Sequence, residues 1–264
     1  MNSFIEFKKV SVIRSARKIL DDINLEIDSD ENVAIIGPNG SGKSVFIKLL
    51  TGKFYPSYTG DNTVCRLFGF ERWNIHNLRS MLGIVTNELQ YDFHNSRSRI
   101  TGFDTVLSGF FSSIGIFSNH VVTKEMTKKA KDIIGFLGVD ALEDKKLEIM
   151  SSGEARIFLI ARALVNNPKV LILDEPSNSL DVASFIKLYN IMRKILSYGT
   201  KIILVTHLVS DIIPEMNRFI FFKDGKVFAD GKRAEIFNSD KLSSLFELKV
   251  KLHESNDLCS ITIL

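Results

Sequence analysis

Residues 37–44, GPNGSGKS, place three glycines and a lysine between an apolar run, NVAII, and a helix-like run, VFIKLL. The segment fits the pattern G-x-x-x-x-G-K-[ST], in which glycines let successive backbone N–H groups converge on phosphate oxygens. A helix that begins near Gly42 adds its positive N-terminal dipole. We therefore expect Lys43 to reach the β- and γ-phosphates of a nucleotide and the Ser44 hydroxyl to ligate Mg²⁺.

The competing interpretation is a glycine-rich turn without a ligand, and the strand before the loop and the helix after it count against this. A phosphate loop by itself is compatible with a GTPase, a kinase or an ATPase. The predicted nucleotide-binding residues of the loop are Gly37, Pro38, Asn39, Gly40, Ser41, Gly42, Lys43, Ser44 and Val45.

A pair of carboxylates follows another apolar run, in the sequence LILDEP. Asp174 and Glu175 come at the carboxyl end of a predicted buried strand, where ligands bind in open α/β sheets. Asp174 is suited to hold Mg²⁺, directly or through water, and Glu175 to polarise the attacking water. The alternative is an Asp-Glu pair in a solvated loop, which is disfavoured because an apolar strand runs straight into it and Pro176 ends that strand.

His207 ends a second apolar run, KIILVTH. An imidazole at this place could contact the γ-phosphate and orient Glu175. A single histidine is more often structural, so this role depends on the other motifs. The histidines without such a context are His76, His94, His120 and His253.

Residues 150–154, MSSGE, precede a run with helical spacing of its apolar residues. Ser151 can cap this helix and Glu154 suits its first turn. The simpler interpretation is a well-capped helix. The functional interpretation is a second anion site, made of a hydroxyl, backbone N–H groups and the helix dipole.

The order of these motifs resembles that of the ATP-binding cassette (ABC) ATPases over roughly residues 4–232. GPNGSGKS looks like their Walker A motif, LILDEP like Walker B with its catalytic glutamate, and MSSGE is similar to the LSGGQ signature. SNSLD (177–181) looks like the D-loop, and His207 matches the switch histidine. The resemblance implies an α/β P-loop NTPase fold with a RecA-like parallel-sheet core, an N-terminal antiparallel β subdomain and an inserted α-helical subdomain. It also implies ATP and Mg²⁺ as cofactors, and Lys43, Glu175 and His207 as catalytic residues.

The resemblance further implies that two such domains pack head to tail, with each nucleotide between one phosphate loop and the partner's signature. Ser151 and Gly153 would then contact the γ-phosphate across the interface, and Asp181 would lie near the dimer seam. ATP binding would close the dimer and hydrolysis would open it.

Several positions depart from the family pattern. Ser152 replaces a glycine and Glu154 a glutamine in the signature, and Val45 replaces a threonine after the phosphate loop. The family glutamine that senses Mg²⁺ and couples to the partner should follow the strand LGIV. That position holds Asn87, with Gln90 one helical turn later, and both stay candidates for the metal-sensing residue.

The aromatic residue that stacks on adenine in this family should fall near Ile13 or Arg14, and neither is aromatic. The planar guanidinium of Arg14 can stack on a base, and the direct alternative is a weaker hold on the base. We therefore expect looser discrimination between ATP and GTP.

The elements that must position these residues follow from the apolar pattern. Continuous apolar runs predict buried parallel strands, and helices between them predict coverage of both faces of the sheet. A helix-rich insertion is expected over about residues 88–160, within a cassette domain of residues 1–242, and the role of the tail 243–264 is left open. The predicted strands are FIEFKKVSVI, INLEI, NVAIIG, LFGF, LGIV, VLILDEP and KIILVTH, and RFIFFKDGKVFADG predicts a hairpin that turns at Asp224-Gly225.

The formal net charge is +3, from 34 Lys and Arg and 31 Asp and Glu. This balance offers no basic face, so we expect no direct nucleic-acid partner. The cysteines, Cys65 and Cys259, lack metal-ligand spacing and indicate free thiols in a reducing compartment. No run approaches the length of a membrane span, and the start does not resemble a signal peptide. The expected location is cytoplasmic, peripheral at the membrane face through a partner.

Two functions from different classes remain open at this point. The first is the nucleotide-binding subunit of a membrane transporter, with FDTVLSGFFSSIGIF supplying either a docking surface for a permease or the insertion's own core. The second is a soluble cassette ATPase that acts on the ribosome, DNA or another protein. The chain carries one cassette, no long coiled coil and no basic face, which favours transport. A non-hydrolysing regulator is disfavoured by the intact Lys43, Asp174, Glu175 and His207.

Overall fold

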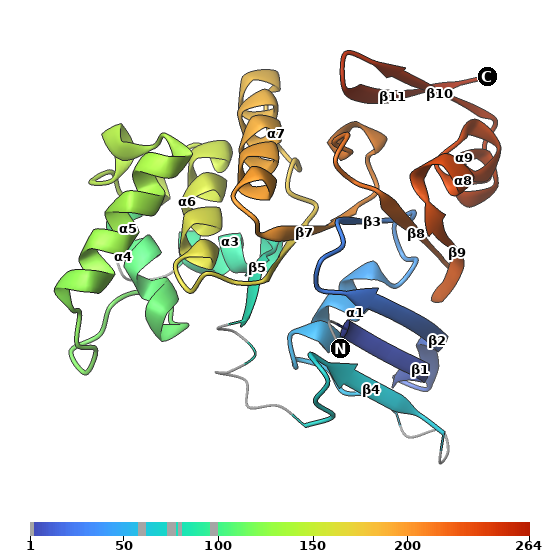
Figure 1. Ribbon diagram of the computed structural model, residues 1–264, viewed down its shortest axis with the longest axis horizontal. Helices are drawn as coiled ribbons and strands as arrows, with labels where there is room; N and C mark the ends of the chain where they lie inside the picture. The colour runs from blue at the N-terminus through green and yellow to red at the C-terminus, as the bar shows by residue number, and fades with distance from the viewer. Residues whose placement is uncertain (1–2, 58–61, 73–77, 79–80, 96–99) are drawn as a thin grey trace. The chain divides into compact units, whose positions relative to one another are not determined.

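The computed structural model describes residues 3–57, 62–72, 78, 81–95 and 100–264, and all the predicted site residues lie within these ranges. The chain divides into two compact units, the first formed by Met1–Leu78 with Lys201–Leu264 and the second by Arg79–Thr200. In Figure 1 the first unit is coloured blue to cyan and orange to red, and the second runs from teal through green to yellow-orange.

The first unit contains an antiparallel sheet in the order β2-β1-β4 (Figure 1). The strands are β1 (Ser3–Arg14), β2 (Arg17–Asp28) and β4 (Val64–Leu67). The predicted N-terminal strands are therefore confirmed, and they form the antiparallel β subdomain. The strand predicted over LFGF is wrong, because β4 ends at Leu67. Phe68 and Gly69 follow with positive φ of 50° and 81°, which turns the chain so that Leu67 and Phe70 exchange backbone hydrogen bonds.

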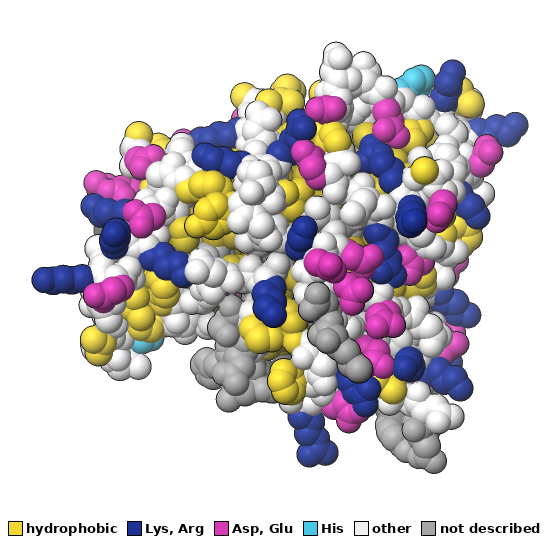
Figure 2. Space-filling view, viewed as in Figure 1, with side chains coloured by type: hydrophobic (Ala, Val, Ile, Leu, Met, Phe, Trp, Pro, Cys, Tyr) yellow, Lys and Arg dark blue, Asp and Glu magenta, His cyan; other side chains and the backbone are white. Residues whose placement is uncertain are grey.

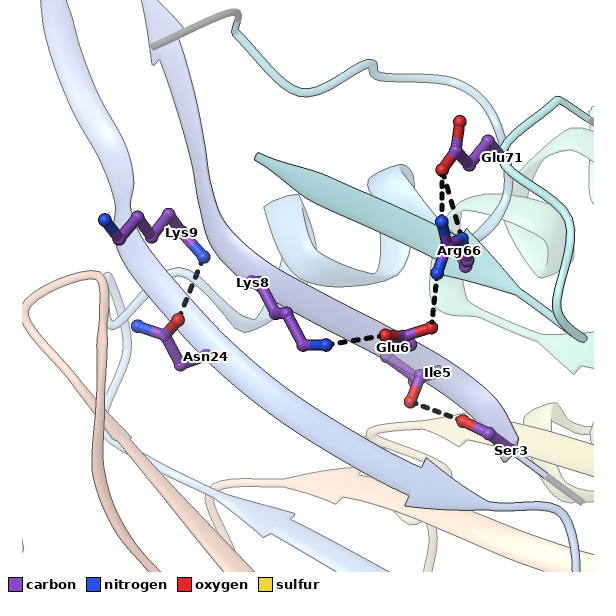
Figure 3. Close-up of polar contacts among 8 residues, drawn as sticks. All are labelled: Ser3, Ile5, Glu6, Lys8, Lys9, Asn24, Arg66 and Glu71. Carbon is purple, nitrogen blue, oxygen red and sulfur yellow. Dashed lines mark hydrogen bonds and ion pairs between the residues drawn. The ribbon is translucent and has the colours of Figure 1, made fainter. Parts of the chain in front are cut away.

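The outer face of this sheet carries a small polar cluster (Figure 3). Glu6 lies opposite Arg66 in the β1–β4 register and accepts from its Nη1 at 3.1 Å and from Lys8 Nζ at 2.9 Å. These bonds lower the pKa of the Glu6 carboxyl, first through Lys8 and then through Arg66. The two ion pairs are partly exposed and contribute little to the stability of the sheet. The inner face, where Ile5 and Phe7 are buried, holds the sheet in place.

The first unit also contains parallel strands around β3 (Val33–Ile36), whose residues are all fully buried. β3 lies between β7 (Lys201–Thr206) and β8 (Arg218–Lys223) and runs parallel to both. β8 pairs antiparallel with β9 (Lys226–Lys232) across Asp224 and Gly225. Both turn residues have positive φ, 49° and 74°, so the predicted hairpin is confirmed. Helix α1 (Lys43–Leu50) follows β3.

The C-terminal residues of the first unit form helices and a second hairpin. A 3-10 turn, η4 (Val209–Asp211), precedes β8, and α8 (Arg233–Ile236) and α9 (Ser239–Phe246) follow β9. β10 (Val250–Ser255) packs on α9 and pairs antiparallel with β11 (Leu258–Ile263). The segment predicted as a tail thus contains an ordered hairpin, and residue 242 lies inside α9.

The second unit combines two parallel strands, β5 (Leu82–Val85) and β6 (Val170–Asp174), with a group of helices. The helical spacing predicted for this part of the chain is confirmed, and residues 96–99 of it lie outside the described residues. The helices are α3 (Asn87–His94), α4 (Gly102–Ser108), α5 (Lys124–Leu137), α6 (Ser152–Leu164) and α7 (Val182–Ser197), with 3-10 turns η1 (Gly109–Phe111), η2 (Asp140–Leu142) and η3 (Leu147–Ile149).

Helix α4 packs closely on α6. A Cβ atom added at Gly102 would lie 2.6 Å from the Phe158 ring, and one at Gly109 would lie 2.3 Å from the Arg162 carbonyl oxygen. Val106 is buried, whereas Phe117, farther along the phenylalanine-rich segment, is 52% exposed. The start of that segment is therefore core of the second unit rather than a docking surface.

Charged side chains of both signs are intermixed over the face of the molecule in Figure 2. In the described part of the chain, no helix has the length and apolar character that a membrane crossing requires.

Candidate active site

The phosphate loop leaves β3 at Gly37 and enters α1 at Lys43. Gly37 has no room for a side chain, because a Cβ atom there would lie 2.3 Å from the Phe222 carbonyl oxygen. Gly42 precedes α1 with φ 102°, in the left-handed region that only glycine adopts without strain. These two positions explain why the loop needs glycine, and they leave its backbone N–H groups uncovered by side chains.

Lys43 lies inside the loop and is only 5% exposed. Its Nζ donates to the carbonyl oxygens of Gly37 at 2.6 Å and of Pro38 at 3.0 Å. The ammonium group is therefore held within the arc of the loop, where phosphate oxygens would come. The Ser44 hydroxyl, one residue later, is on an exposed residue and is accessible to a metal ion.

A hairpin turn far along the chain supports the loop. Gly225 donates its N–H to the Ser41 carbonyl at 3.1 Å, and its own carbonyl accepts from the Asp21 N–H at 2.9 Å. A Cβ atom at Gly225 would lie 2.4 Å from the Ile19 carbonyl oxygen. The Asp-Gly dipeptide signalled the turn in the sequence, but nothing in its spacing indicated that the turn supports the phosphate loop.

His207 follows β7, and Thr206 is paired with Ile36 of β3 in the parallel register. The phosphate loop and His207 therefore leave the same edge of these strands. The Thr206 hydroxyl donates to the buried Asp211 carboxylate at 2.5 Å and accepts from the Leu208 N–H at 2.9 Å. These bonds fix the backbone on both sides of His207. Of the other histidines, His76 lies outside the described residues.

In the second unit, Asp174 ends β6, and Val85 of β5 pairs with Leu173. Asp174, Glu175 and the start of α3 therefore lie at the same edge of these two strands. Glu175 has φ 46°, a left-handed backbone that a non-glycine residue adopts at a cost of about 1–3 kcal/mol and that clusters at functional sites. Its Oε2 accepts from Asn178 Nδ2 at 2.6 Å, a contact that sequence reasoning did not identify.

The predicted cap of α6 is confirmed, and it forms a full capping box. Ser151 Oγ accepts from the Glu154 N–H at 3.2 Å, and Glu154 Oε2 accepts from the Ser151 N–H at 2.9 Å. Lys145 Nζ also donates to Glu154 Oε2, at 2.7 Å. Lys145 and then the Ser151 backbone hold the pKa of the Glu154 carboxyl below its ordinary value. The glutamate in the place of the family glutamine thus gains a charged partner.

Gly153 is buried, and a Cβ atom there would lie 2.7 Å from Ser184 Oγ at the start of α7. The first turns of α6 and α7 are therefore in close contact. Ser151 and Ser152, by contrast, are exposed. The signature segment thus keeps both serines at the surface, while its glycine allows the two helices to approach.

Asn87 and Gln90, the two candidates for the metal-sensing residue, have different partners. Asn87 Oδ1 accepts from Nη2 of the buried Arg156 at 2.6 Å. Gln90 Nε2 donates to the Ser152 carbonyl at 3.1 Å, while its Oε1 is buried without a hydrogen-bond partner among the residues that the structure describes. The side-chain oxygen of Asn87 is therefore occupied and that of Gln90 is available.

Arg14, at the exposed end of β1, lies with its Cζ 4.3 Å from the centroid of the Phe54 ring. The segment that carries Phe54 is tied to β1, since Ile13 N–H donates to Ser57 Oγ at 2.9 Å. The sequence did not single out Phe54, because it lies 40 residues from Arg14 and outside any motif. The guanidinium plane is thus already held by an aromatic ring.

Comparisons with known proteins agree with these features. The family model for ABC transporters matches residues 20–178, which is more than half of the chain. YlmA of Bacillus subtilis, an uncharacterized ABC transporter ATP-binding protein, is 30% identical over 255 residues, covering 96% of this chain and 94% of YlmA. HmuV of Bradyrhizobium diazoefficiens, a hemin import ATP-binding protein, is 27% identical over 97% of this chain and 93% of its own length.

A solved structure has the same fold. One chain of an inward-facing transporter assigned to the metal-chelate type superposes with a TM-score of 0.80 and 21% identity, over 100% of this chain and 98% of that one. These relatives support the transporter hypothesis. They do not support a cassette that acts on the ribosome, DNA or another protein. The chain belongs to the ABC transporter family, as an α/β P-loop ATP-binding cassette that hydrolyses ATP and powers a transporter.

Proposed function

We propose that the phosphate loop of this chain binds ATP together with Mg²⁺, and that Glu175 activates the attacking water. The observation that carries the proposal is the loop itself, with Gly42 in the left-handed region, Lys43 buried inside the arc and Ser44 accessible at the start of α1. Lys43 would hold the β- and γ-phosphates, and Ser44 and Asp174 would hold the metal ion. When bound, Mg²⁺ neutralises charge that develops on the phosphate oxygens.

Gln90 rather than Asn87 serves as the metal-sensing residue in this proposal. A metal ligand needs an oxygen that is not already engaged, and Asn87 Oδ1 is bound to a guanidinium at 2.6 Å. A cationic donor also makes that oxygen a poor ligand for a second cation. Gln90 directs its amide N–H₂ group to Ser152 and keeps Oε1 available, which supports its assignment.

The positions of the general base and of His207 are set by the backbone in this proposal. Glu175 is held by its left-handed backbone and by Asn178, so its carboxylate has a preferred direction. The Thr206 hydroxyl, bonded to Asp211 and to the Leu208 N–H, fixes the backbone on both sides of His207. His207 would contact the γ-phosphate and orient Glu175. A general base positioned in this way contributes by taking a proton from water in the transition state.

A second cassette, identical or related, completes the site in this proposal. Ser151 and Gly153 at the start of α6, a helix of 13 residues, would contact the γ-phosphate bound to the partner, with Asp181 near the seam. The exposed Ser151 hydroxyl and the N-terminal dipole of α6 suit an anion. Binding of ATP would favour the closed dimer and hydrolysis the open one.

We place this chain at the cytoplasmic face of the membrane, held there by a transmembrane permease subunit, with no direct nucleic-acid partner.

The test uses the Glu175→Gln variant, which should retain ATP and the closed dimer. The tagged variant is crosslinked in native cells, and its partners are identified with and without ATP. A polytopic membrane protein recovered in an ATP-dependent manner is the expected result. Ribosomes, DNA or soluble proteins alone would contradict the proposal.

The Arg14–Phe54 pair is proposed as the platform for the nucleobase, and it predicts weak base selectivity. A guanidinium stacks on any purine face, so ATP and GTP should bind with dissociation constants within about threefold of each other. Arg14→Ala should weaken the binding of both nucleotides by about fivefold, the scale of one exposed cation–π contact. Arg17→Ala, in the same hairpin, is the matched control and should change neither dissociation constant. Calorimetry in the Glu175→Gln background measures the constants, and a strong preference for ATP would count against the platform.

A further inference from the structure

The serine at position 152, which departs from the family glycine, has a specific contact in the second unit. Its Oγ donates to the Ser179 carbonyl oxygen at 3.0 Å. Ser179 belongs to the loop 177–181 between β6 and α7, and α6 and α7 lie side by side (Figure 1). A glycine at position 152 could not make this bond. The substitution therefore adds a hydrogen bond between the signature segment and that loop.

The same residue is held from its other side. The Ser152 carbonyl accepts from Gln90 Nε2 of α3 at 3.1 Å. Ser152 is also the first residue of α6, whose start is fixed by the capping box of Ser151 and Glu154. The hydroxyl that reaches Ser179 is thus carried by a backbone with two independent supports, which gives it a defined direction.

The loop that receives this bond leads to Glu175. Asn178, the neighbour of Ser179, donates to Glu175 Oε2 at 2.6 Å. Both Glu175 and Ser179 have positive φ, 46° and 63°. Two non-glycine residues in the left-handed region make the loop costly to hold, and such strain persists only where surrounding contacts determine the conformation. At its far end the loop is tied by Asp181, whose Oδ1 accepts from the Ser184 N–H at 2.7 Å.

We propose that Ser152 is a positioning residue for ATP hydrolysis. Its hydroxyl holds Ser179 and the strained loop, so that Asn178 keeps the Glu175 carboxylate in its working direction. Gln90 is hydrogen-bonded to Ser152, and Ser152 to Ser179. Asn178, which precedes Ser179, is hydrogen-bonded to Glu175. These contacts join α3, the signature segment and the general base within one unit. The inference rests on the proposed role of Glu175 as general base. It assigns Ser152 no contact with the nucleotide.

The test separates turnover from nucleotide binding. Ser152→Ala removes the hydroxyl and should lower kcat about fivefold, the effect of one neutral hydrogen bond, while KM for ATP changes by less than about twofold. Ser152→Thr retains a hydroxyl and should restore kcat. Ser197→Ala is the matched control, because it removes a hydroxyl bonded to the Lys194 carbonyl at 2.7 Å in the same unit, away from the loop. It should leave kcat unchanged.

A double-variant cycle tests the route through Asn178. If Ser152 acts by holding Asn178, then Ser152→Ala with Asn178→Ala should turn over no more slowly than Asn178→Ala alone. Unchanged kcat in Ser152→Ala, or multiplicative losses in the double variant, would overturn the inference. Glu175→Gln serves as the reference. If that variant keeps its turnover, the proposed function fails. If it is inactive while Ser152→Ala behaves as the wild type, only the role of Ser152 is wrong.

Discussion

Glu175→Gln is expected to bind ATP and to hydrolyse it at least about 100-fold more slowly than the wild type, the scale of losing a general base. The substitution is nearly isosteric, and the glutamine oxygen can still accept from Asn178 Nδ2, which now bonds to Glu175 Oε2 at 2.6 Å. The loop and the left-handed backbone at this position should therefore be retained. Only the ability to take a proton from water is lost.

The measurements are steady-state phosphate release and ATP binding by calorimetry, together with the thermal unfolding temperature. Glu148→Gln is the matched control, since it makes the same change of charge on an exposed residue of the same unit. We expect wild-type hydrolysis from it. Turnover near the wild-type rate in Glu175→Gln, with the fold intact, would remove Glu175 from the role of general base.

Lys43→Ala is expected to reduce hydrolysis by about 10²–10³-fold, the range for removing one preorganised donor to developing charge. It should also weaken ATP binding by about 10–100-fold, since hydrogen bonds to charged groups contribute about 1.5–3 kcal/mol. The lysine is inside the loop and binds the Gly37 and Pro38 carbonyls. Its removal therefore also takes away a support of the loop in the nucleotide-free protein.

Lys241→Ala, at an exposed position of α9 in the same unit, is the control for the loss of a positive charge. Hydrolysis and binding should stay within about twofold of the wild type, because an exposed charge away from the loop contributes little. Unfolding curves show whether Lys43→Ala remains folded, and Lys43→Gln, with a longer side chain, serves as a second variant. A folded Lys43 variant that binds ATP as tightly as the wild type would show that this loop does not hold the phosphates.

The amino-acid sequence determined the features that depend on neighbouring residues. The glycine spacing of residues 37–44, with a strand before it and a helix after it, predicted the phosphate loop, and the local geometry at Gly42 agrees. The Asp224-Gly225 turn and the cap formed by Ser151 were predicted for the same reason. Turns and caps are made by side chains and backbone groups within four residues of one another, so their signals lie in short stretches of sequence.

The one strand prediction that proved wrong shows the limit of this local information. In LFGF, apolar residues flank a glycine as in a strand, but Phe68 takes a positive φ and the chain reverses there. Phe68 N–H donates to the Phe4 carbonyl at 2.8 Å, and its ring packs against the Phe4 ring. The pairing with β1, far away in the sequence, decides where β4 ends.

Only the tertiary structure decided what each predicted site residue contacts. Asn87 pairs with Arg156, which is 69 positions away, and Gln90 with Ser152, 62 positions away. These partners are chosen by the packing of α3 on α6 and have no fixed spacing in the chain. The departure at Ser152 was visible in the sequence, but its bond to Ser179 depends on α6 and α7 lying together. Side chains that meet through packed helices leave no local signal, because the energy that joins them comes from the burial of residues elsewhere.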